Sequence, residues 1–492
     1  MDEEMAQLRT LGTFTLEPLP AARSAIASKW VFRIKQDDNG IISRYKARLV
    51  AKGFSQIPGV DFDETFAPVV RMETIRLLLA LAAHYNLQIH VVDVVGAYLN
   101  GKLDEEIYMQ QPELYEDGTT RVCHLHCTLY GLKQSGRVWN LQLNSSFLKL
   151  GYTRLISDQC VYIRRHNSDI VIVAVHVDDM TVLTSSPALM EQVESELNSE
   201  FSIKKLEEIR QLLGMEITRT KNSIHLTQVQ YITKILEKYQ MDKRNPVATP
   251  IDPNVTLAKL PDGTSYPEIQ PFYQHMVGSL LYAAITTRPD IAHAVQALSQ
   301  FNTNPGPVHL TAVKRVFRYL CGTINLGIEY RSDPVTAFEL FSDSNWGNCP
   351  DTRRSITGYV SKYAGGAITW NSKKQPTVAL SSMEAEYMAL SSATREALWL
   401  RTILSELGLD ISLPTHINVN NHSTILFAQN SGYHSRSKHI DIRYHFIREN
   451  IAFNKVSVSY IPTDENAADI FTKGLTRSKH EYLTSLLGMI RA

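Results

Sequence analysis

The sequence predicts an α+β protein with several domains, and two kinds of pattern carry that prediction. Runs of β-branched and apolar residues, typical of strands, surround acidic residues at 87–95 and 171–183. From about residue 336 the pattern changes to strand, strand, helix and strand. The chain has 492 residues, which indicates about three domains of ordinary size. With 44% hydrophobic and 20% charged residues, its composition is that of a globular protein and not of a disordered one.

Charge and cysteine content limit the possible partners and the cellular compartment. The 50 basic and 50 acidic residues cancel, so any polyanionic partner must be recognised by local clusters of charge. Five cysteines form an odd, sparse set that indicates a reducing compartment. No apolar run reaches the ~18–20 residues needed to span a bilayer, and the acidic start Met1–Glu4 is unlike a signal peptide. We expect an intracellular, soluble protein.

One short segment, Cys123–Cys127 with the sequence CHLHC, has residue types that suggest zinc. The five residues alternate along a predicted strand, however, and no second pair of ligands follows at zinc-finger spacing. We therefore favour an ordinary strand over a zinc site in this segment.

A basic hairpin is predicted near the N-terminus. A strand over 29–35 leads into the turn Asp38–Gly40, and the chain returns over 42–54. Between residues 21 and 54, eight basic residues face two acids. Such a hairpin with interleaved aromatic residues suits phosphate binding. A solvated basic hairpin without a ligand is the alternative.

Three acids lie at the ends of predicted strands. Asp178 and Asp179 are expected in a tight hairpin turn or at the end of a buried strand, and Asp93 ends a second strand that follows a predicted buried helix over 74–84. A carboxylate held against an apolar sheet is costly unless a positive charge compensates it. Grouped carboxylates can hold divalent cations, and two such ions about 3.5–4 Å apart drive phosphoryl transfer. From the residues alone, an ordinary Asp-Asp turn remains the alternative.

A series of motifs then favours the metal site over the ordinary turn. In chain order they are KWVFRIK, RYKARLVAKGF, VDFDETFAPVV, VDVVGAYLNG, EIYMQQPE, LYGLKQSGRVWN, HVDDM and LLGMEI, which together cover residues 12–250. GSLLY, TTRPDIA, KRVFRYLCGT and HSRSKHIDIRYHFIR follow further along the chain. With these motifs the chain resembles the polymerase segment of copia-type LTR retrotransposons.

The resemblance implies a right-hand reverse transcriptase with fingers, palm and thumb. Asp93, Asp178 and Asp179 would be its catalytic, metal-binding acids. Tyr98 would lie beneath the sugar and exclude a 2′-hydroxyl, Gln134 would belong to the nucleotide pocket, and Lys46 or Arg48 would bind the incoming triphosphate. A packing role for Tyr98 and Gln134 remains the alternative.

One motif departs from the family. His176 stands two positions before the acid pair, where the family usually has tyrosine. Because that side chain supports the primer end and binds no metal, we expect the change to tune activity and not to abolish it. Histidine also titrates near neutrality, so activity could gain a dependence on pH.

The predicted domains follow from the same motifs. Residues 1–245 would form the fingers and palm with the start of the thumb, including amphipathic segments at 188–201 and 227–241 around a strand at 212–218. Residues 246–335 would form a linker and a helical thumb or connection region. Residues 336–492 would form a ribonuclease-H-like α/β domain.

In that last domain the resemblance implies a second acidic site, formed by Asp343, Glu386 and Asp469. Glu386 is preferred over Glu384, which would instead be a first-turn acid favoured by the helix dipole. The family's fourth acid is replaced by Asn420. An amide removes one negative charge from a site for two dications and adds an NH₂ donor. We therefore expect strongly reduced ribonuclease H activity.

These expectations together define an RNA-directed DNA polymerase. Each active site would use two Mg²⁺ ions, with Mn²⁺ as a substitute. The partners would be RNA and DNA template-primers, RNA–DNA hybrids and deoxynucleoside triphosphates, with no membrane; association with the element's capsid and integrase is left open. The expected location is the cytoplasm, in virus-like particles, with the nucleus left open. The alternative is a decayed or recruited remnant that only binds nucleic acid.

Overall fold

The computed structural model describes residues 1–36, 42–167, 169–204, 206–332, 338–429 and 441–491. The predicted turn Asp38–Gly40 and residues 434–440 of the motif HSRSKHIDIRYHFIR lie outside this part of the chain. The chain forms two compact units. The first unit comprises Met1–Val70 and Gln88–Glu208, and the second comprises Arg71–Leu87 and Ile209–Ala492.

An antiparallel six-stranded sheet organises the first unit, with strand order β11-β4-β10-β9-β8-β7. Two helices, α3 and α4, pack on it through an apolar cluster that includes Trp139, Val173, Val182 and Val193. The elements are β4 (Gln88–Asp93), β7 (Thr153–Arg154), β8 (Val161–His166), β9 (Asp169–His176), β10 (Asp179–Thr184), β11 (Glu207–Glu208), α3 (Ser135–Lys149) and α4 (Pro187–Glu200).

Two smaller sheets complete the first unit. Strands β1, β6 and β5 form an antiparallel three-stranded sheet with β6 in the middle, and β2 pairs with β3 in the basic hairpin. Helix α1 contacts β3. The elements are α1 (Asp2–Thr10), β1 (Phe14–Glu17), β2 (Ser28–Gln36), β3 (Ile42–Ala51), η1 (Gly53–Ser55), η2 (Ala97–Asn100), β5 (Lys102–Met109) and β6 (Val122–Cys127).

The second unit contains two five-stranded sheets. One is antiparallel, with order β12-β13-β14-β15-β21, and the other has order β18-β17-β16-β19-β20. Strands β16, β19 and β20 run parallel to one another. The strands are β12 (Gln211–Leu212), β13 (Met215–Arg219), β14 (Ser223–Thr227), β15 (Leu326–Arg331), β16 (Glu339–Asn345), β17 (Ile356–Tyr363), β18 (Gly366–Lys374), β19 (Thr415–Val419), β20 (Val456–Tyr460) and β21 (Met489–Arg491).

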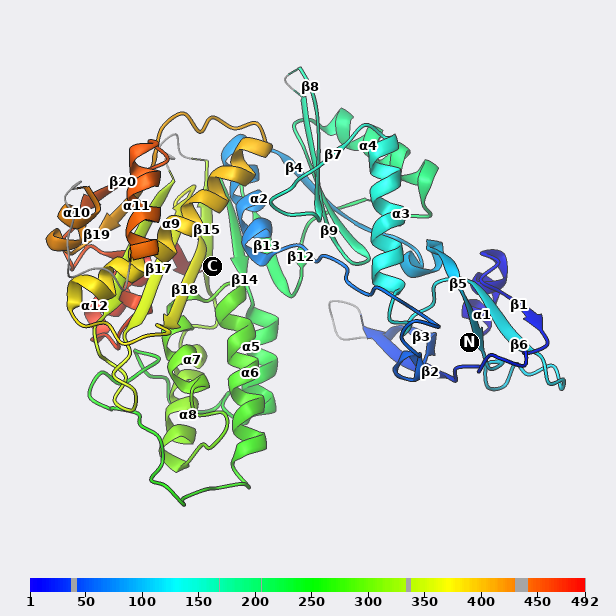
Figure 1. Ribbon diagram of the computed structural model, residues 1–492, viewed down its shortest axis with the longest axis horizontal. Coiled ribbons are helices and arrows are strands. Elements are labelled where there is room, and N and C mark those ends of the chain that lie inside the picture. The colour runs from blue at the N-terminus through cyan, green and yellow to red at the C-terminus, as the bar shows by residue number, and fades with distance from the viewer. Residues whose placement is uncertain (37–41, 168, 205, 333–337, 430–440, 492) are drawn as a thin grey trace. The chain divides into compact units, whose positions relative to one another are not determined.

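Two groups of helices pack in the second unit, with α2 and α12 outside them. The long helix α9 packs on β16 and β17, with α10 and α11 beside it (Figure 1). Helices α5, α6, α7 and α8 share one large apolar cluster. The bounds are α2 (Met72–Tyr85), α5 (Val229–Lys238), α6 (Gln270–Thr286), η3 (Pro289–Ile291), α7 (Ala292–Ser299), α8 (Pro307–Cys321), α9 (Ser382–Glu406), α10 (His422–Gln429), α11 (Asp441–Ala452), η5 (Ala467–Phe471) and α12 (Arg477–Leu486). Within the described residues, no helix combines the length and hydrophobicity needed to cross a membrane.

Helix α2 confirms the predicted buried helix, but it packs in the second unit although β4 follows it directly. Its Arg76 is buried and donates to the carbonyls of Ile368 at 2.6 Å, Ile285 at 2.6 Å and Thr286 at 3.1 Å. The guanidinium lies 3.8 Å from the ring centroid of Trp370. Burial lowers the pKa of Arg76. Since buried carbonyls are costly without a donor, Arg76 fixes α2 to this unit.

The boundary between the units differs from the predicted domain boundary at residue 245. The first unit ends at Glu208 because β12, β13 and β14 pair with one another and then with β15. Residues 211–227 are therefore part of a sheet in the second unit. The roles assigned to the predicted domains stay predictions.

A short helical turn follows Asn466 near the C-terminal end of the described chain. Asn466 caps this 3-10 turn, η5, by accepting from the amide of Ala468 at 3.1 Å. The chain leaves the helical path at Thr472, whose hydroxyl bonds the Asp469 carbonyl at 3.1 Å and the Asp343 carboxylate. The next helix, α12, begins at Arg477.

Candidate active sites

The three polymerase acids meet at one end of the six-stranded sheet. Asp93 is the last residue of β4 and is paired with Asp179, the first residue of β10. Asp178 lies in the turn between β9 and β10, and its carbonyl accepts from the amide of Val94 at 3.3 Å. The predicted hairpin turn is confirmed, and it lies beside the strand that carries Asp93.

Backbone strain marks this turn. Val177 has a φ of +61°, a left-handed conformation that is unfavourable for a β-branched residue. The indole Nε1 of Trp139 donates to the Val177 carbonyl at 2.8 Å. A strained residue held in place by a buried neighbour is typical of a functional site, and here it sets the direction of the following acid, Asp178.

A cavity of about 470 Å³ opens beside the acids within the first unit. Its lining combines acids with a basic group that includes the two residues predicted to bind triphosphate. The charged lining residues are Asp2, Glu3, Glu4, Arg44, Lys46, Arg48, Asp93, Asp178 and Lys204. The cavity can therefore receive an anion and a cation side by side.

Asp178 is the most buried of the three acids. Burial raises its pKa, and the negative charges of Asp93 and Asp179 raise it further, while the positive charges of Arg48 and Lys46 lower it. Its Oδ1 atom is buried without a hydrogen-bond partner. A buried carboxylate oxygen without a donor is costly, so the atom is suited to a cation.

Lysine and arginine side chains surround the acids. Lys204 Nζ forms an ion pair with Asp93. Arg48 stacks on the ring of Tyr130, with its Cζ 4.6 Å from the ring centroid, and its Nε is buried without a hydrogen-bond partner. These groups compensate the acids in the absence of a metal.

Tyr98 and Gln134 have different surroundings. Tyr98 lies on η2, half-buried, with its ring 5.2 Å from the ring of Tyr130. Burial raises its pKa and the charge of Asp178 raises it further, so Tyr98 lies near the acids. Gln134 is buried, donates to the Asp61 carbonyl at 2.8 Å and accepts from Gln56 at 3.0 Å. Gln134 does not line the cavity, and its role in a nucleotide pocket stays a prediction.

A second group of acids lies in the second unit. Asp343 on β16 and Asp469 on η5 are fully buried, and Glu386 on α9 is nearly so. Burial raises the pKa of Asp343 to about 7, with the charge of Asp469 as the next cause. Burial also raises the pKa of Glu386 well above its usual value, with the charge of Asp343 adding to it. The structure thus brings the three predicted acids together.

Two lysines neutralise this group. Lys473 Nζ lies 2.8 Å from Asp469 Oδ1 and 4.0 Å from Asp343 Oδ2. Lys479 Nζ lies 2.8 Å from Asp469 Oδ2. Glu386 Oε2, in contrast, is buried without a hydrogen-bond partner. The carboxylate oxygens fit a hard divalent cation, but the two lysines compete for the same charge.

Asn420 lies at this site, directly after β19. Its amide nitrogen donates to Asp343 Oδ1 at 3.2 Å and to Thr463 Oγ1 at 3.3 Å. An aspartate in this place would add a carboxylate beside Asp343, whereas the asparagine turns a donor toward it. Asn420 therefore occupies one of the oxygens that a metal would use.

Glu384 has a different role from Glu386. Its carboxylate accepts from the amide of Leu380 at 2.7 Å, and its own amide donates to the side chain of Ser381 at 3.2 Å. The Ser381 side chain thus caps the start of α9, and Glu384 is an acid of the first helical turn, as expected.

Comparisons with known proteins identify the family. A family model described as reverse transcriptase (RNA-dependent DNA polymerase) matches residues 11–253. A Ty5-1 transposon protein of Saccharomyces cerevisiae is 34% identical over 311 residues, which are 62% of this chain and 100% of that protein. The Pol polyprotein from transposon TNT 1-94 of Nicotiana tabacum is 42% identical over 99% of this chain.

The chain belongs to the copia-type retrotransposon reverse transcriptases. The predicted family is confirmed. This reverse transcriptase segment spans 37% of the tobacco polyprotein. It spans 32% of the Pol polyprotein from transposon RE1 of Arabidopsis thaliana, to which it is 37% identical over 96% of its own length.

Solved structures match only distantly. The ribonuclease H1 LC11, isolated from compost, is 15% identical, with a TM-score of 0.23 over 28% of this chain and 94% of that one. A foamy viral protease–reverse transcriptase in complex with double-stranded DNA is 12% identical, with a TM-score of 0.24 over 93% of this chain and 68% of that one. At these TM-scores neither match carries an argument about this reverse transcriptase.

Three of the cations at the two sites were missed from the sequence. Lys204, Lys473 and Lys479 contact the acids, but no motif marks them. Only the spacing of Lys473, four residues after Asp469, offered a signal. His176, singled out from the sequence, ends β9 and is paired with Asp179, so it does lie next to the acids.

The buried acid Asp343 predicts a dependence of stability on pH in the metal-free chain. Its pKa is about 7 in the fold and 3.8 without it, so protonation stabilises the folded state. This contribution is fully present below 3.8 and is lost as pH rises through about 7. With a chelator present, we expect the urea midpoint of the parent to fall over this range relative to that of Asp343→Asn. The exposed Asp262→Asn is the control and should follow the parent; a parallel pH dependence in Asp343→Asn would contradict the prediction.

Proposed function

We propose that this chain is an RNA-directed DNA polymerase that joins deoxynucleotides by two-metal nucleotidyl transfer. The observation that carries the proposal is the register of Asp93 opposite Asp179, with the orphaned oxygen of Asp178 beside them. Family membership supports it, because the matched family is that of reverse transcriptases.

The residues around the cavity have separate roles. Asp93, Asp178 and Asp179 would hold the divalent cations, Mg²⁺ or Mn²⁺, through carboxylate oxygens. When bound, the two ions would favour attack by the primer hydroxyl and stabilise the leaving pyrophosphate. Arg48 and Lys46 would neutralise the negative charge of the triphosphate. An unpaired charge is costly in a cavity of low dielectric constant.

Lys204 would keep Asp93 paired until a cation replaces it. A lysine ammonium and a divalent cation compete for one carboxylate, so the lysine must move when the metal arrives. Tyr98, near Asp178 and half-buried, would present its ring to the sugar and limit the substrate to deoxynucleotides.

A right-hand arrangement is part of the proposal. We assign the six-stranded sheet with α3 and α4 to the palm, and the hairpin β2–β3 with the sheet β1-β6-β5 to the fingers. Helices α5 to α8 would serve as thumb and connection. Asp93 and Asp179 at strand ends of the central sheet support the assignment of the palm.

The site of Asp343, Glu386 and Asp469 would be a ribonuclease H site weakened by Asn420. In support, the Asn420 amide donates to Asp343 where a carboxylate would otherwise face the metal. The expected partners are RNA and DNA template-primers, RNA–DNA hybrids and deoxynucleoside triphosphates. We propose action in cytoplasmic virus-like particles, with the nucleus as alternative; the five free cysteines suit a reducing compartment.

Primer extension tests the polymerase. On an RNA template with Mg²⁺ or Mn²⁺, the parent should extend a DNA primer, and Asp178→Asn should lose at least about a thousandfold because a metal ligand is replaced. Asp169→Asn removes an exposed carboxylate at the far end of the same hairpin and should match the parent. An inactive, folded parent would favour a remnant that only binds nucleic acid, and an active Asp178→Asn would contradict the assigned site.

Restoring the missing acid tests the second site. Asn420→Asp should raise cleavage of the RNA strand in a labelled RNA–DNA hybrid by roughly 10- to 100-fold, because it adds a metal-binding charge and removes the donor on Asp343. Asn421→Asp makes the same change one residue later, at a side chain that accepts from the amide of Thr424 at 2.9 Å, and should have no effect. Equal cleavage by the parent and Asn420→Asp would show that Asn420 does not limit this site.

A further inference from the structure

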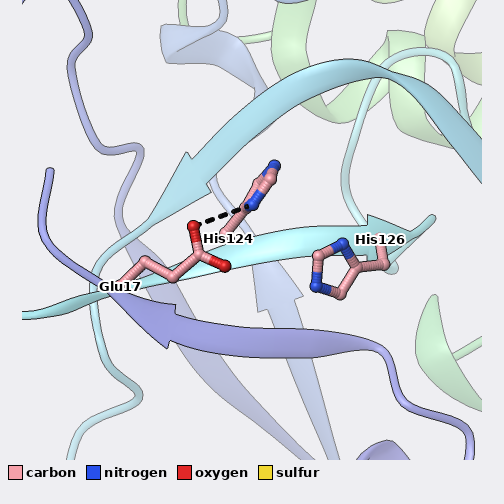
Figure 2. Close-up of side chains that lie close together, drawn as sticks. All are labelled: Glu17, His124 and His126. Carbon is pink, nitrogen blue, oxygen red and sulfur yellow. Dashed lines mark hydrogen bonds and ion pairs between the residues drawn. The ribbon is translucent and has the colours of Figure 1, made fainter. Parts of the chain in front are cut away.

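Two histidines and a glutamate converge on the outer face of the sheet β1-β6-β5. His124 and His126 are two residues apart on β6, so their side chains leave the strand on the same side. Glu17 ends the neighbouring strand β1, where Thr15 is paired with His124. Figure 2 shows the three side chains on one face, with the Glu17 carboxylate directed toward the rings.

The ligand atoms are already close. Glu17 Oε2 lies 3.2 Å from His124 Nδ1. The Thr15 hydroxyl donates to Glu17 Oε1 at 2.6 Å and lies 2.9 Å from His126 Nε2. One ligand atom from each of Glu17, His124 and His126 lies within 4.8 Å of the others.

This spacing suits a small transition-metal ion. Zinc bonds of about 2.0–2.2 Å in a tetrahedral site place neighbouring ligand atoms roughly 3.3 Å apart. Side-chain rotations that move the ligand atoms by up to about 1.5 Å would bring the three atoms to that distance. Two imidazoles and one carboxylate leave a coordination position open to water, as in zinc sites with three protein ligands.

The neighbouring side chains favour this ligand set. The ring of Tyr108 stacks on His124 with centroids 4.8 Å apart and an angle of 22°, which fixes the plane of the imidazole. The Thr15 hydroxyl, which donates to Glu17 Oε1, holds the carboxylate beside the rings.

The cysteines of the same segment are not part of the site. Cys123 lies on the opposite face of β6 and is fully buried in the apolar cluster of that side. The alternation predicted from CHLHC thus separates the cysteines from the histidines, which excludes a zinc-finger set and leaves the histidines available to Glu17.

We propose that Glu17, His124 and His126 bind a zinc-class divalent cation. Imidazole ligands select Zn²⁺, Co²⁺, Ni²⁺ or Cu²⁺ over Mg²⁺, which separates this site from the all-carboxylate sites. The ion would join β1, an edge strand of four residues, to the central strand β6. Since β1 directly follows α1, whose acids line the cavity beside Asp93, the ion would also anchor the segment that carries them.

Cobalt binding to the full chain tests the proposal. Co²⁺ is added in the presence of excess Mg²⁺, which occupies the carboxylate sites. One equivalent of Co²⁺ should then give the intense visible absorption of a four- or five-coordinate ion with nitrogen ligands. His126→Gln and Glu17→Gln should both lose this absorption. The second variant keeps an oxygen that can accept from Thr15, so it tests the ligand charge without removing the hydrogen bond. His166→Gln, at an exposed histidine ending β8, is the control and should bind as the parent does.

Thermal unfolding gives an independent readout. Zn²⁺ should raise the unfolding temperature of the parent and of His166→Gln, and it should leave that of His126→Gln and Glu17→Gln unchanged. Absence of the cobalt absorption in the folded parent would overturn the proposal and leave a hydrogen-bonded surface cluster. Equal absorption in parent, His126→Gln and Glu17→Gln would overturn it as well, because the ion would then lie elsewhere.

Discussion

The pairing of Asp93 with Asp179 across β4 and β10 is the constraint on which the first unit depends. Like charges directly opposite each other destabilise a sheet, and Asp178 adds a third carboxylate in the adjacent turn. The structure compensates them with Lys204 on Asp93 and with the charges of Lys46 and Arg48 near Asp178. A sheet end that concentrates negative charge in this way gains stability from any cation that binds there, which links the fold directly to metal binding.

The second unit compensates its grouped carboxylates in a different way. There the carboxylates of Asp343 and Asp469 are fully buried, and the ammonium groups of Lys473 and Lys479 lie within ion-pair distance of Asp469. Asn420 lowers the total negative charge by one. A metal ion at this site would therefore have to displace the two lysines from Asp469.

Sequence patterns predicted the strands that carry the acids, because β-branched runs that end in aspartate leave few alternatives. They did not predict Lys204 or Lys479, since the residues around each lysine carry no local signature of its acidic partner. They also placed α2 with the polymerase, whereas the structure packs it in the second unit. The sequence could not show this, because Arg76 contacts the carbonyls of Ile368 and Ile285, more than two hundred positions away. The CHLHC segment was predicted as a strand, but the approach of Glu17 depends on the register of β1, which no local pattern encodes.

Metal counting tests the central claim most directly. The number of Mn²⁺ ions bound per chain is measured by electron paramagnetic resonance, with template-primer and an incoming nucleotide present, in the parent and in Asp178→Asn. If the acids at the end of β4 and β10 hold the catalytic ions, the parent binds more Mn²⁺ than the variant. Equal numbers of bound ions in the two folded proteins would contradict the assignment of this sheet end as the polymerase site.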